Sequence, residues 1–166
     1  MTVNVRLAAL ALLLLLGACA FYAPLQPAPD YYVMRHLNTA PGTPDPDLTE
    51  EGRRNAELLA NWFAAPPPAT IFVSTAKRAQ QTAAPLAARL GITPRVYDPA
   101  DTDGLLTEMM KEPWPILIVG HSNTVPEIVA RLGGTRPPPL GHDDFGDIWH
   151  ISGPRRTVTK RRLGGG

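Results

Sequence analysis

The chain has 166 residues, and its 16 Lys and Arg residues nearly balance its 15 Asp and Glu residues, giving a formal net charge of +1. This length suffices for one domain with a sizeable core but not for two ordinary domains. The balanced charge provides no overall positive field, so the composition excludes a protein that attracts nucleic acid through its net charge.

The N-terminal segment has the three-part organisation of an export signal. One positive charge, Arg6, precedes an apolar run over residues 7–16, and the small residues of LGAC lead to Cys19. The run is too short to span a bilayer comfortably, which favours a secretory signal. LGAC also resembles the bacterial lipobox, whose cysteine carries lipid; an ordinary export signal or a buried helix with an incidental cysteine is the alternative. We therefore expect a signal peptide over residues 1–18 and a lipid anchor at Cys19, holding the protein to the bacterial cell envelope (the periplasmic face of the outer membrane in a Gram-negative cell).

A proline-rich spacer is predicted over residues 19–29. Strand signals then alternate with helix signals. Apolar and β-branched runs predict strands near residues 30–34, 70–73, 95–97, 115–120 and 147–151. The first helix is expected to begin after Thr49 and reach about residue 63, and the second to end at Gly91 with a kink at Pro85. Two further helices are predicted, one over residues 103–111 and one with apolar positions between residues 125 and 132.

The basic stretch over residues 155–162, RRTVTKRR, is interpreted as an exposed edge strand whose charges block edge pairing. Strands that alternate with helices predict a single three-layer α/β/α domain with a mainly parallel central sheet. We place this domain over residues 30–163 and a flexible tail over residues 164–166.

Basic side chains follow three of the predicted strands. Because the carboxyl ends of parallel strands meet at one edge of a sheet, these side chains should share a crevice. Helix N-termini nearby favour an anion there, arginine matches phosphate oxygens, and a neutral imidazole can attack phosphorus. The predicted cluster consists of Arg35 and His36 after the first strand, Arg78 after the second, and His121 after the fourth, with Ser122 and Asn123 at the next helix start.

Four segments, VMRH, LTEEGRRNAELLA, STAKRAQQTAAPLA and VGHSNT, occur in this order between about residues 31 and 132. Together they resemble the short form of the histidine phosphatase superfamily, also called the phosphoglycerate mutase-like superfamily. The resemblance implies a metal-independent phosphatase without a cofactor, monomeric, acting on a phosphorylated small molecule or a phosphoprotein. His36 would be transiently phosphorylated, while the phosphoryl group would be bound by Arg35, Arg78 and His121, with support from Thr39, Ser122 and Asn123.

Two positions depart from the family pattern. Leu37 follows the expected nucleophile where the family has glycine or alanine, and its side chain either narrows the pocket or points into the core. No carboxylate stands in the family's general-acid motifs, and Asp98 is the candidate, with a turn-opening Asp as the alternative. Short family members that act on phosphohistidine manage without an obvious acid, because the leaving nitrogen of a phosphoramidate is easily protonated. The GHDD segment over residues 141–144 imitates a metal site, but a solvated loop is the preferred interpretation.

These observations favour hydrolysis of a phosphomonoester or phosphohistidine through a phosphohistidine intermediate on His36. The alternative is a catalytically weak or inactive envelope lipoprotein that binds an anionic ligand in the same pocket. A mutase is a third hypothesis, disfavoured by the short chain and by export away from glycolytic intermediates.

Overall fold

The computed structural model describes residues 28–63 and 65–164. The predicted signal peptide, Cys19 and most of the proposed spacer lie outside these residues. Within the described part of the chain, no helix is both long enough and apolar enough to cross a membrane.

The described chain forms a six-stranded sheet in the order β3-β2-β4-β1-β5-β6. The first four strands in this order are parallel, whereas β5 runs antiparallel to β1 and β6 antiparallel to β5. The fold is therefore the single α/β domain with a mainly parallel sheet that the sequence predicted. Its elements are β1 (Tyr31–Arg35), α2 (Glu50–Trp62), β2 (Thr70–Ser74), α3 (Lys77–Leu90), β3 (Arg95–Tyr97), α4 (Thr102–Met109), β4 (Ile116–Gly120), α5 (Val125–Arg131), β5 (Asp147–Ser152) and β6 (Thr157–Arg162).

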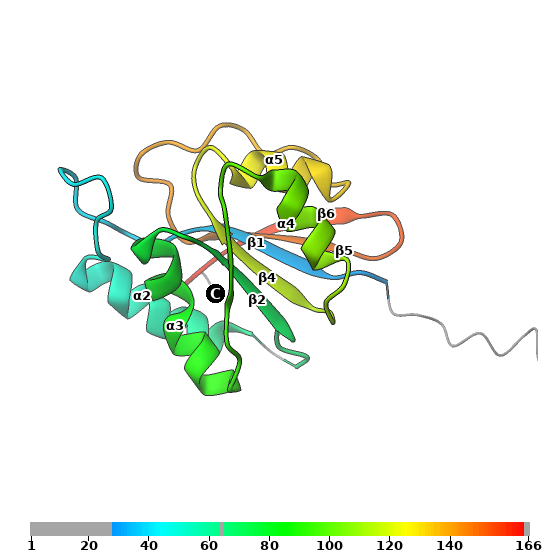
Figure 1. Ribbon diagram of the computed structural model, residues 1–166, viewed down its shortest axis with the longest axis horizontal. Helices are drawn as coiled ribbons and strands as arrows, with labels where there is room; N and C mark the ends of the chain where they lie inside the picture. Colours follow the sequence, from blue (N-terminus) through cyan, green and yellow to red (C-terminus); the bar gives the residue numbers. More distant parts are fainter. Residues whose placement is uncertain (1–27, 64, 165–166) are drawn as a thin grey trace, which may run out of the picture.

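The helices cover both faces of the sheet, with α2 and α3 on one side and α4 and α5 on the other (Figure 1). Alternate residues of a strand point to opposite faces, so each central strand supplies both cores. In β4, Leu117 and Val119 pack toward α2 and α3, while Ile116 and Ile118 pack toward α4 and α5. All four are fully buried, because both faces of this central strand are covered.

The helix ends follow the expected capping chemistry. The Thr49 hydroxyl accepts a hydrogen bond from the Gly52 N–H at 3.1 Å and begins α2, and Gly91 ends α3 with a left-handed φ of 66°. Gly52 is also required for packing, since a Cβ there would lie 2.3 Å from the carbonyl oxygen of Asn38. This close approach ties the segment after β1 to the start of α2.

The strand β6 lies at the edge of the sheet, as its basic sequence predicted. Lys160 and Arg162 form ion pairs with the buried Asp147 of β5, at 3.1 Å and 3.5 Å. Arg161, on the other face, lies 4.7 Å from the centre of the Trp62 ring. Three side chains of the basic stretch thus make contacts within the domain.

Three strands deliver their carboxyl ends to one place. Arg35 of β1 pairs with Gly120 of β4, and Val73 of β2 pairs with Val119. Arg35, Ser74 and Gly120 therefore lie side by side at the carboxyl ends of these parallel strands. The residues that follow β1, β2 and β4 are therefore neighbours in space.

Candidate active site

A cavity of about 310 Å³ opens at the carboxyl ends of the strands β1, β2 and β4. Its walls come from the end of β1, the loop before α2, the first turn of α3, the turn after β4 and one residue of the loop before β5. The lining residues are Arg35, His36, Thr39, Ala40, Pro41, Thr43, Pro44, Pro46, Arg78, His121, Ser122, Asn123 and His142. The structure thus brings together the four residues of the predicted cluster and the three predicted supporting residues.

His36 is 5% exposed, and its ring position is fixed by its own backbone neighbourhood. Its Nδ1 lies 2.8 Å from the carbonyl oxygen of Leu37, which can only accept a hydrogen bond. In the neutral ring Nδ1 therefore carries the proton, and Nε2 keeps its lone pair. Burial is the main reason that the pKa of His36 falls from 6.5 to about 4; the positive charges of Arg35 and Arg78 lower it further, against the Leu37 hydrogen bond.

His121 is held in the opposite tautomer. Its Nδ1 lies 3.4 Å from Nη2 of Arg78, which can only donate, and its Nε2 lies 2.8 Å from the Ser74 hydroxyl oxygen. Nε2 therefore carries the proton and donates a hydrogen bond to the Ser74 hydroxyl oxygen. Burial, followed by the charges of Arg78 and Arg35, lowers the pKa of His121 to about 4. His36 and His121 are thus both neutral near pH 7.

Ser74 is a member of the site that the sequence analysis missed. It is fully buried at the end of β2, and its hydroxyl oxygen accepts a hydrogen bond from the Nε2–H of His121, which fixes the orientation of that ring. Thr124 has a similar supporting role, because its hydroxyl accepts a hydrogen bond from the His121 N–H at 2.9 Å. Gly120 leaves room for this contact, since a Cβ there would lie 2.8 Å from the Thr124 hydroxyl oxygen.

The guanidinium of Arg35 is held by the loop before β5. One of its terminal nitrogens donates to the carbonyl oxygens of Gly141 at 2.7 Å and His142 at 3.0 Å. Its central carbon lies 4.1 Å from the centre of the Phe145 ring, a favourable cation–π distance. Its Nε is buried without a protein partner. Burial lowers the pKa of Arg35, but the group stays cationic near neutral pH.

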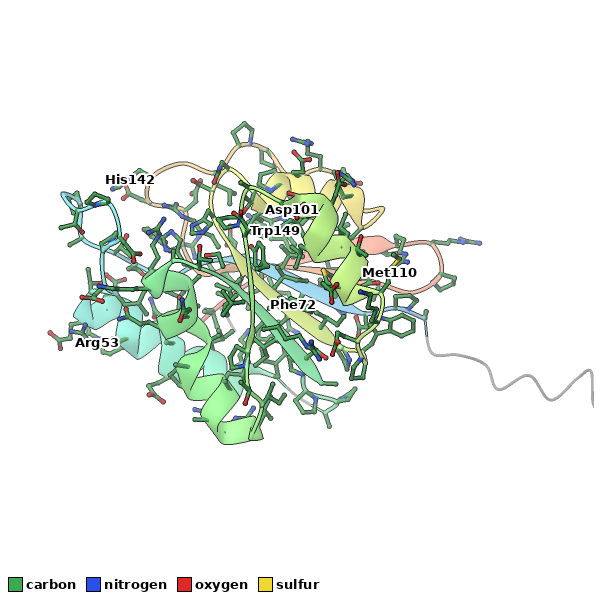
Figure 2. All side chains as sticks on the ribbon, in the orientation of Figure 1. Arg53, Phe72, Asp101, Met110, His142 and Trp149 are labelled. Atoms are coloured by element: carbon green, nitrogen blue, oxygen red, sulfur yellow. The ribbon has the colours of Figure 1, made fainter. Side chains whose placement is uncertain are left out.

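The GHDD segment therefore contributes backbone carbonyls to Arg35, a role that no residue-type pattern indicated. Its Asp144 carboxylate accepts a hydrogen bond from the Gly141 N–H at 2.6 Å, which closes the loop on itself. Among residues 28–63 and 65–164, no group of three or more His, Cys, Asp or Glu side chains is placed to hold a metal ion. Figure 2 shows His142 at the side of the molecule where this loop approaches the cyan loop before α2.

Leu37 points into the core and does not narrow the cavity. It is fully buried among the residues packed against α2 and α3. Its N–H donates to the Thr82 hydroxyl at 3.0 Å, and that hydroxyl donates to the carbonyl oxygen of Arg78 at 2.7 Å. The leucine side chain at position 37 thus leaves the pocket open, and the backbone N–H of the same residue links the chain beside His36 to the helix that carries Arg78.

Asp98 is not brought to this site. It lines a separate cavity of about 450 Å³ between β3 and α4, together with Phe72 and Asp101, both labelled in Figure 2. Its carboxylate accepts a hydrogen bond from the Ala100 N–H at 2.9 Å, as in an Asp that opens a turn. The alternative interpretation of Asp98 fits this geometry, and the general-acid assignment does not.

Among the residues that the structure describes, the lining of the histidine cavity contains no Asp or Glu. The carboxylate in direct contact with that lining is Asp45, whose Oδ1 lies 3.3 Å from Nη1 of Arg78. The same oxygen accepts a hydrogen bond from the Lys77 N–H at 3.1 Å, at the start of α3. Asp45 lies in a loop without a readable motif, so no sequence pattern indicated its place beside the cavity.

Similar solved structures support the same fold. A mycobacterial glucosyl-3-phosphoglycerate phosphatase superposes with a TM-score of 0.62 at 20% identity, over 81% of this chain and 97% of that one. The protein histidine phosphatase SixA, complexed with tungstate, superposes with a TM-score of 0.60 at 20% identity, over 80% of this chain and 94% of that one.

One curated relative is more similar in sequence over a short stretch. The PE-PGRS family protein PE_PGRS11 of Mycobacterium tuberculosis is 52% identical over 54 residues, which is 32% of this chain and 9% of that protein's length. The chain thus spans less than a tenth of that relative.

The family assignment rests on the sequence elements that build the cavity. The description of the histidine phosphatase superfamily (branch 1) matches residues 31–114, from β1 through α4, which is half of the chain. This range contains His36, its two arginine neighbours in the cavity and the serine that orients His121. The chain belongs to branch 1 of the histidine phosphatase superfamily.

Proposed function

We propose that this protein is a phosphatase that hydrolyses a phosphomonoester or a phosphoramidate through a phosphohistidine intermediate on His36. The observation that carries this proposal is the unprotonated Nε2 of a buried, neutral His36, placed in one cavity with Arg35, Arg78 and His121. A nucleophile with a free lone pair beside two fixed cations matches the needs of phosphoryl transfer.

The reaction has two steps. In the first, the Nε2 lone pair of His36 forms a bond to phosphorus, and the bond from phosphorus to the leaving oxygen or nitrogen breaks. The leaving group takes that electron pair and acquires a proton from solvent water. In the second step, water attacks phosphorus and gives up a proton to solvent, the N–P bond breaks, and its electron pair returns to Nε2 of His36 as inorganic phosphate forms. Arg35 and Arg78 stabilise the charge on the phosphoryl oxygens in both steps.

The proton for the leaving group has no carboxylate source in the cavity lining. A leaving group that departs as a weak base, or the nitrogen of a phosphohistidine, makes the smallest demand for an acid. We therefore assign the enzyme to substrates of this kind, the chemistry named for SixA among the similar structures.

Rapid quenching of a reaction with a ³²P-labelled aryl phosphate tests the proposal. We expect labelled protein whose bond is labile in acid and stable in base, as for a phosphoramidate. His36→Ala and His36→Asn should both abolish the label and the turnover while keeping the folded circular dichroism spectrum. Label that persists in both folded variants would overturn the assignment of the nucleophile. Tight vanadate binding without turnover by the unmodified protein would favour the non-catalytic, anion-binding alternative.

We also propose that the mature protein is lipid-anchored at Cys19 in the bacterial envelope. The support is the LGAC sequence after the apolar run. Cys19→Ala should move the protein from the membrane fraction to the soluble fraction, and Cys19→Ala protein that stays in the membrane fraction would contradict the anchor.

A further inference from the structure

The loop over residues 39–48 lines one side of the cavity. An antiparallel bridge between Thr39 and Leu48 joins its two ends. Two carboxylates then fasten the loop to α3: Asp45 at the first turn, and Asp47, which accepts a hydrogen bond from the Gln81 side chain at 2.8 Å. The three prolines of the loop restrict its backbone further. The loop is thus attached to the domain at both of its ends and through α3.

The position of Asp45 within this loop separates it from Asp47. Its neighbours Pro44 and Pro46 both line the cavity. Its carboxylate contacts Arg78, one of the residues expected to bind the phosphoryl group. Its side chain is 44% exposed, whereas that of Arg78 is 20% exposed. Asp45 therefore presents a negative charge at the outer side of Arg78, where the cavity meets solvent.

The cations of the cavity all belong to its inner end. Arg35 is held by loop carbonyls beside His36, and Arg78 is held between His121 and Asp45. The loop residues that line the outer part, such as Pro41, Thr43 and Pro44, are uncharged. In an in-line displacement the leaving group departs on the side opposite His36. The loop residues of the lining offer this group no lysine or arginine that could pair with an anion, and Asp45, beside the lining at Arg78, adds a negative charge.

We propose that Asp45 is a specificity-determining residue, which selects substrates whose leaving group is neutral or cationic and disfavours leaving groups that carry their own negative charge. This inference rests on the proposed phosphatase function and names its substrate class. A phosphorylated histidine side chain in a neutral or basic peptide fits the class. A phosphorylated sugar acid, or a compound with a second phosphate near the first, does not.

The same contact gives Asp45 a second effect. Its carboxylate and an incoming phosphate compete for the guanidinium of Arg78. Removing the charge of Asp45 should therefore strengthen the binding of inorganic phosphate while it weakens the discrimination between leaving groups. A residue that only stabilised the loop would produce neither change.

The test uses three aryl phosphates with leaving groups of closely matched basicity, substituted at the 4-position with methyl, carboxymethyl or aminomethyl. The corresponding benzylphosphonates, which cannot be hydrolysed, are measured by calorimetry on the same full-length protein. Asp45→Asn removes the charge and keeps the shape of the side chain. Asp47→Asn is the matched control, because Asp47 lies on the same loop but contacts Gln81, which is not a lining residue, whereas Asp45 contacts the lining residue Arg78.

We expect the unmodified protein to favour the methyl and aminomethyl compounds over the carboxymethyl compound by about tenfold in kcat/KM and in phosphonate affinity, since like charges in proximity are unfavourable. Asp45→Asn should reduce this ratio to about threefold or less and tighten phosphate binding, while Asp47→Asn leaves both unchanged. An unmodified protein without charge preference would overturn the inference, as would equal effects of the two variants. Absence of turnover of the methyl compound would instead overturn the proposed function, because the phosphonate ratios are measured without catalysis.

Discussion

The two sides of the cavity differ in how firmly the fold holds them. His36 and His121 are 5% and 8% exposed, follow central strands, and each ring is hydrogen-bonded by a group that the fold fixes. Asp45 lies on an exposed loop, held by contacts to the first turn of one helix. The buried side has the geometry that chemistry on phosphorus requires, and the exposed side has the charge that distinguishes one substrate from another. Changes on the buried side should thus affect rate and stability together.

The pH dependence provides the largest test of the buried side. Burial lowers the pKa of His36 to about 4, so its Nε2 stays unprotonated from neutral pH down to about pH 5. We expect kcat/KM, corrected for ionisation of the substrate, to be flat across the ordinary histidine range. It should then fall about tenfold for each pH unit below 4. Titration of the histidine ring protons by NMR checks the same value directly. A midpoint near 6.5 for both His36 and His121 would show that the rings are solvated.

The same shift predicts the direction of the change in stability. The folded pKa values of His36 and His121 lie below the unfolded value of 6.5, so between pH 6.5 and 4 the unfolded chain binds more protons. The free energy of unfolding should be fully supported by these groups above pH 6.5, decrease as the pH falls, and level off below 4. One pKa unit corresponds to ~1.4 kcal/mol, so a fall from 6.5 to about 4 accounts for at most about 3.5 kcal/mol for each histidine. Urea unfolding at pH 7 and pH 4.5 measures the loss.

Arg78 is the next largest expected effect, because it belongs to the buried side and contacts the exposed one. Replacing it with alanine removes a charged hydrogen-bond donor, which typically costs ~1.5–3 kcal/mol, or about 10- to 150-fold in phosphate or vanadate affinity. Arg54→Ala is the control, since Arg54 forms an exposed ion pair with Glu50 within α2. Its effect on stability should stay below about 0.5 kcal/mol, with no effect on the anion. Equal vanadate affinity in the two variants would remove Arg78 from the site.

The buried side was also the part that sequence reasoning could reach. Apolar strands, the Thr49 cap and the Gly91 stop follow from local patterns, and the rule that strand ends converge placed His36 and His121 together. Ser74 was missed because a serine at the end of an apolar strand gives no indication of a partner 47 residues away. The contact of the loop over residues 141–145 with Arg35 was not predicted, for a related reason. It holds Arg35 through backbone carbonyls, which every residue type possesses.

The positions of the side chains of Leu37 and Asp45 also could not be predicted from residue type. Whether Leu37 faced the pocket or the core depended on the direction of the backbone after β1, which the residue type does not determine. Asp45 is one of several acidic residues near the start of α2, and only the docking of its loop on α3 brings it to Arg78.

Ser74→Ala tests whether the orientation of His121 matters for the chemistry. The variant leaves the buried Nε2–H of His121 without its acceptor, which should lower the free energy of unfolding by ~1–3 kcal/mol. We also expect kcat to fall more than KM rises, because Ser74 orients a ring of the cluster and does not reach the cavity lining. Ser74→Thr can restore the acceptor and is the informative rescue. If alanine lowers stability but leaves kcat unchanged, the hydrogen bond is structural only.

The smallest expected effect belongs to Asp98, and it decides whether a carboxylic acid takes part in the proposed reaction. Asp98→Asn keeps the oxygen that accepts the Ala100 N–H, so the turn after β3 should be preserved and the free energy of unfolding should change by less than about 0.5 kcal/mol. Because Asp98 faces a different cavity from His36, turnover of aryl phosphates and of alkyl phosphates should be equally unaffected. An acid would behave differently: its loss would slow alkyl phosphates, whose leaving oxygen needs a proton, far more than aryl phosphates. A selective loss with alkyl substrates in Asp98→Asn would thus show that the loop after β3 reaches the leaving group. If Asp98→Asn and the unmodified protein turn over both kinds of substrate at the same rates, leaving-group basicity and the charge of Asp45 remain as the main controls on substrate choice.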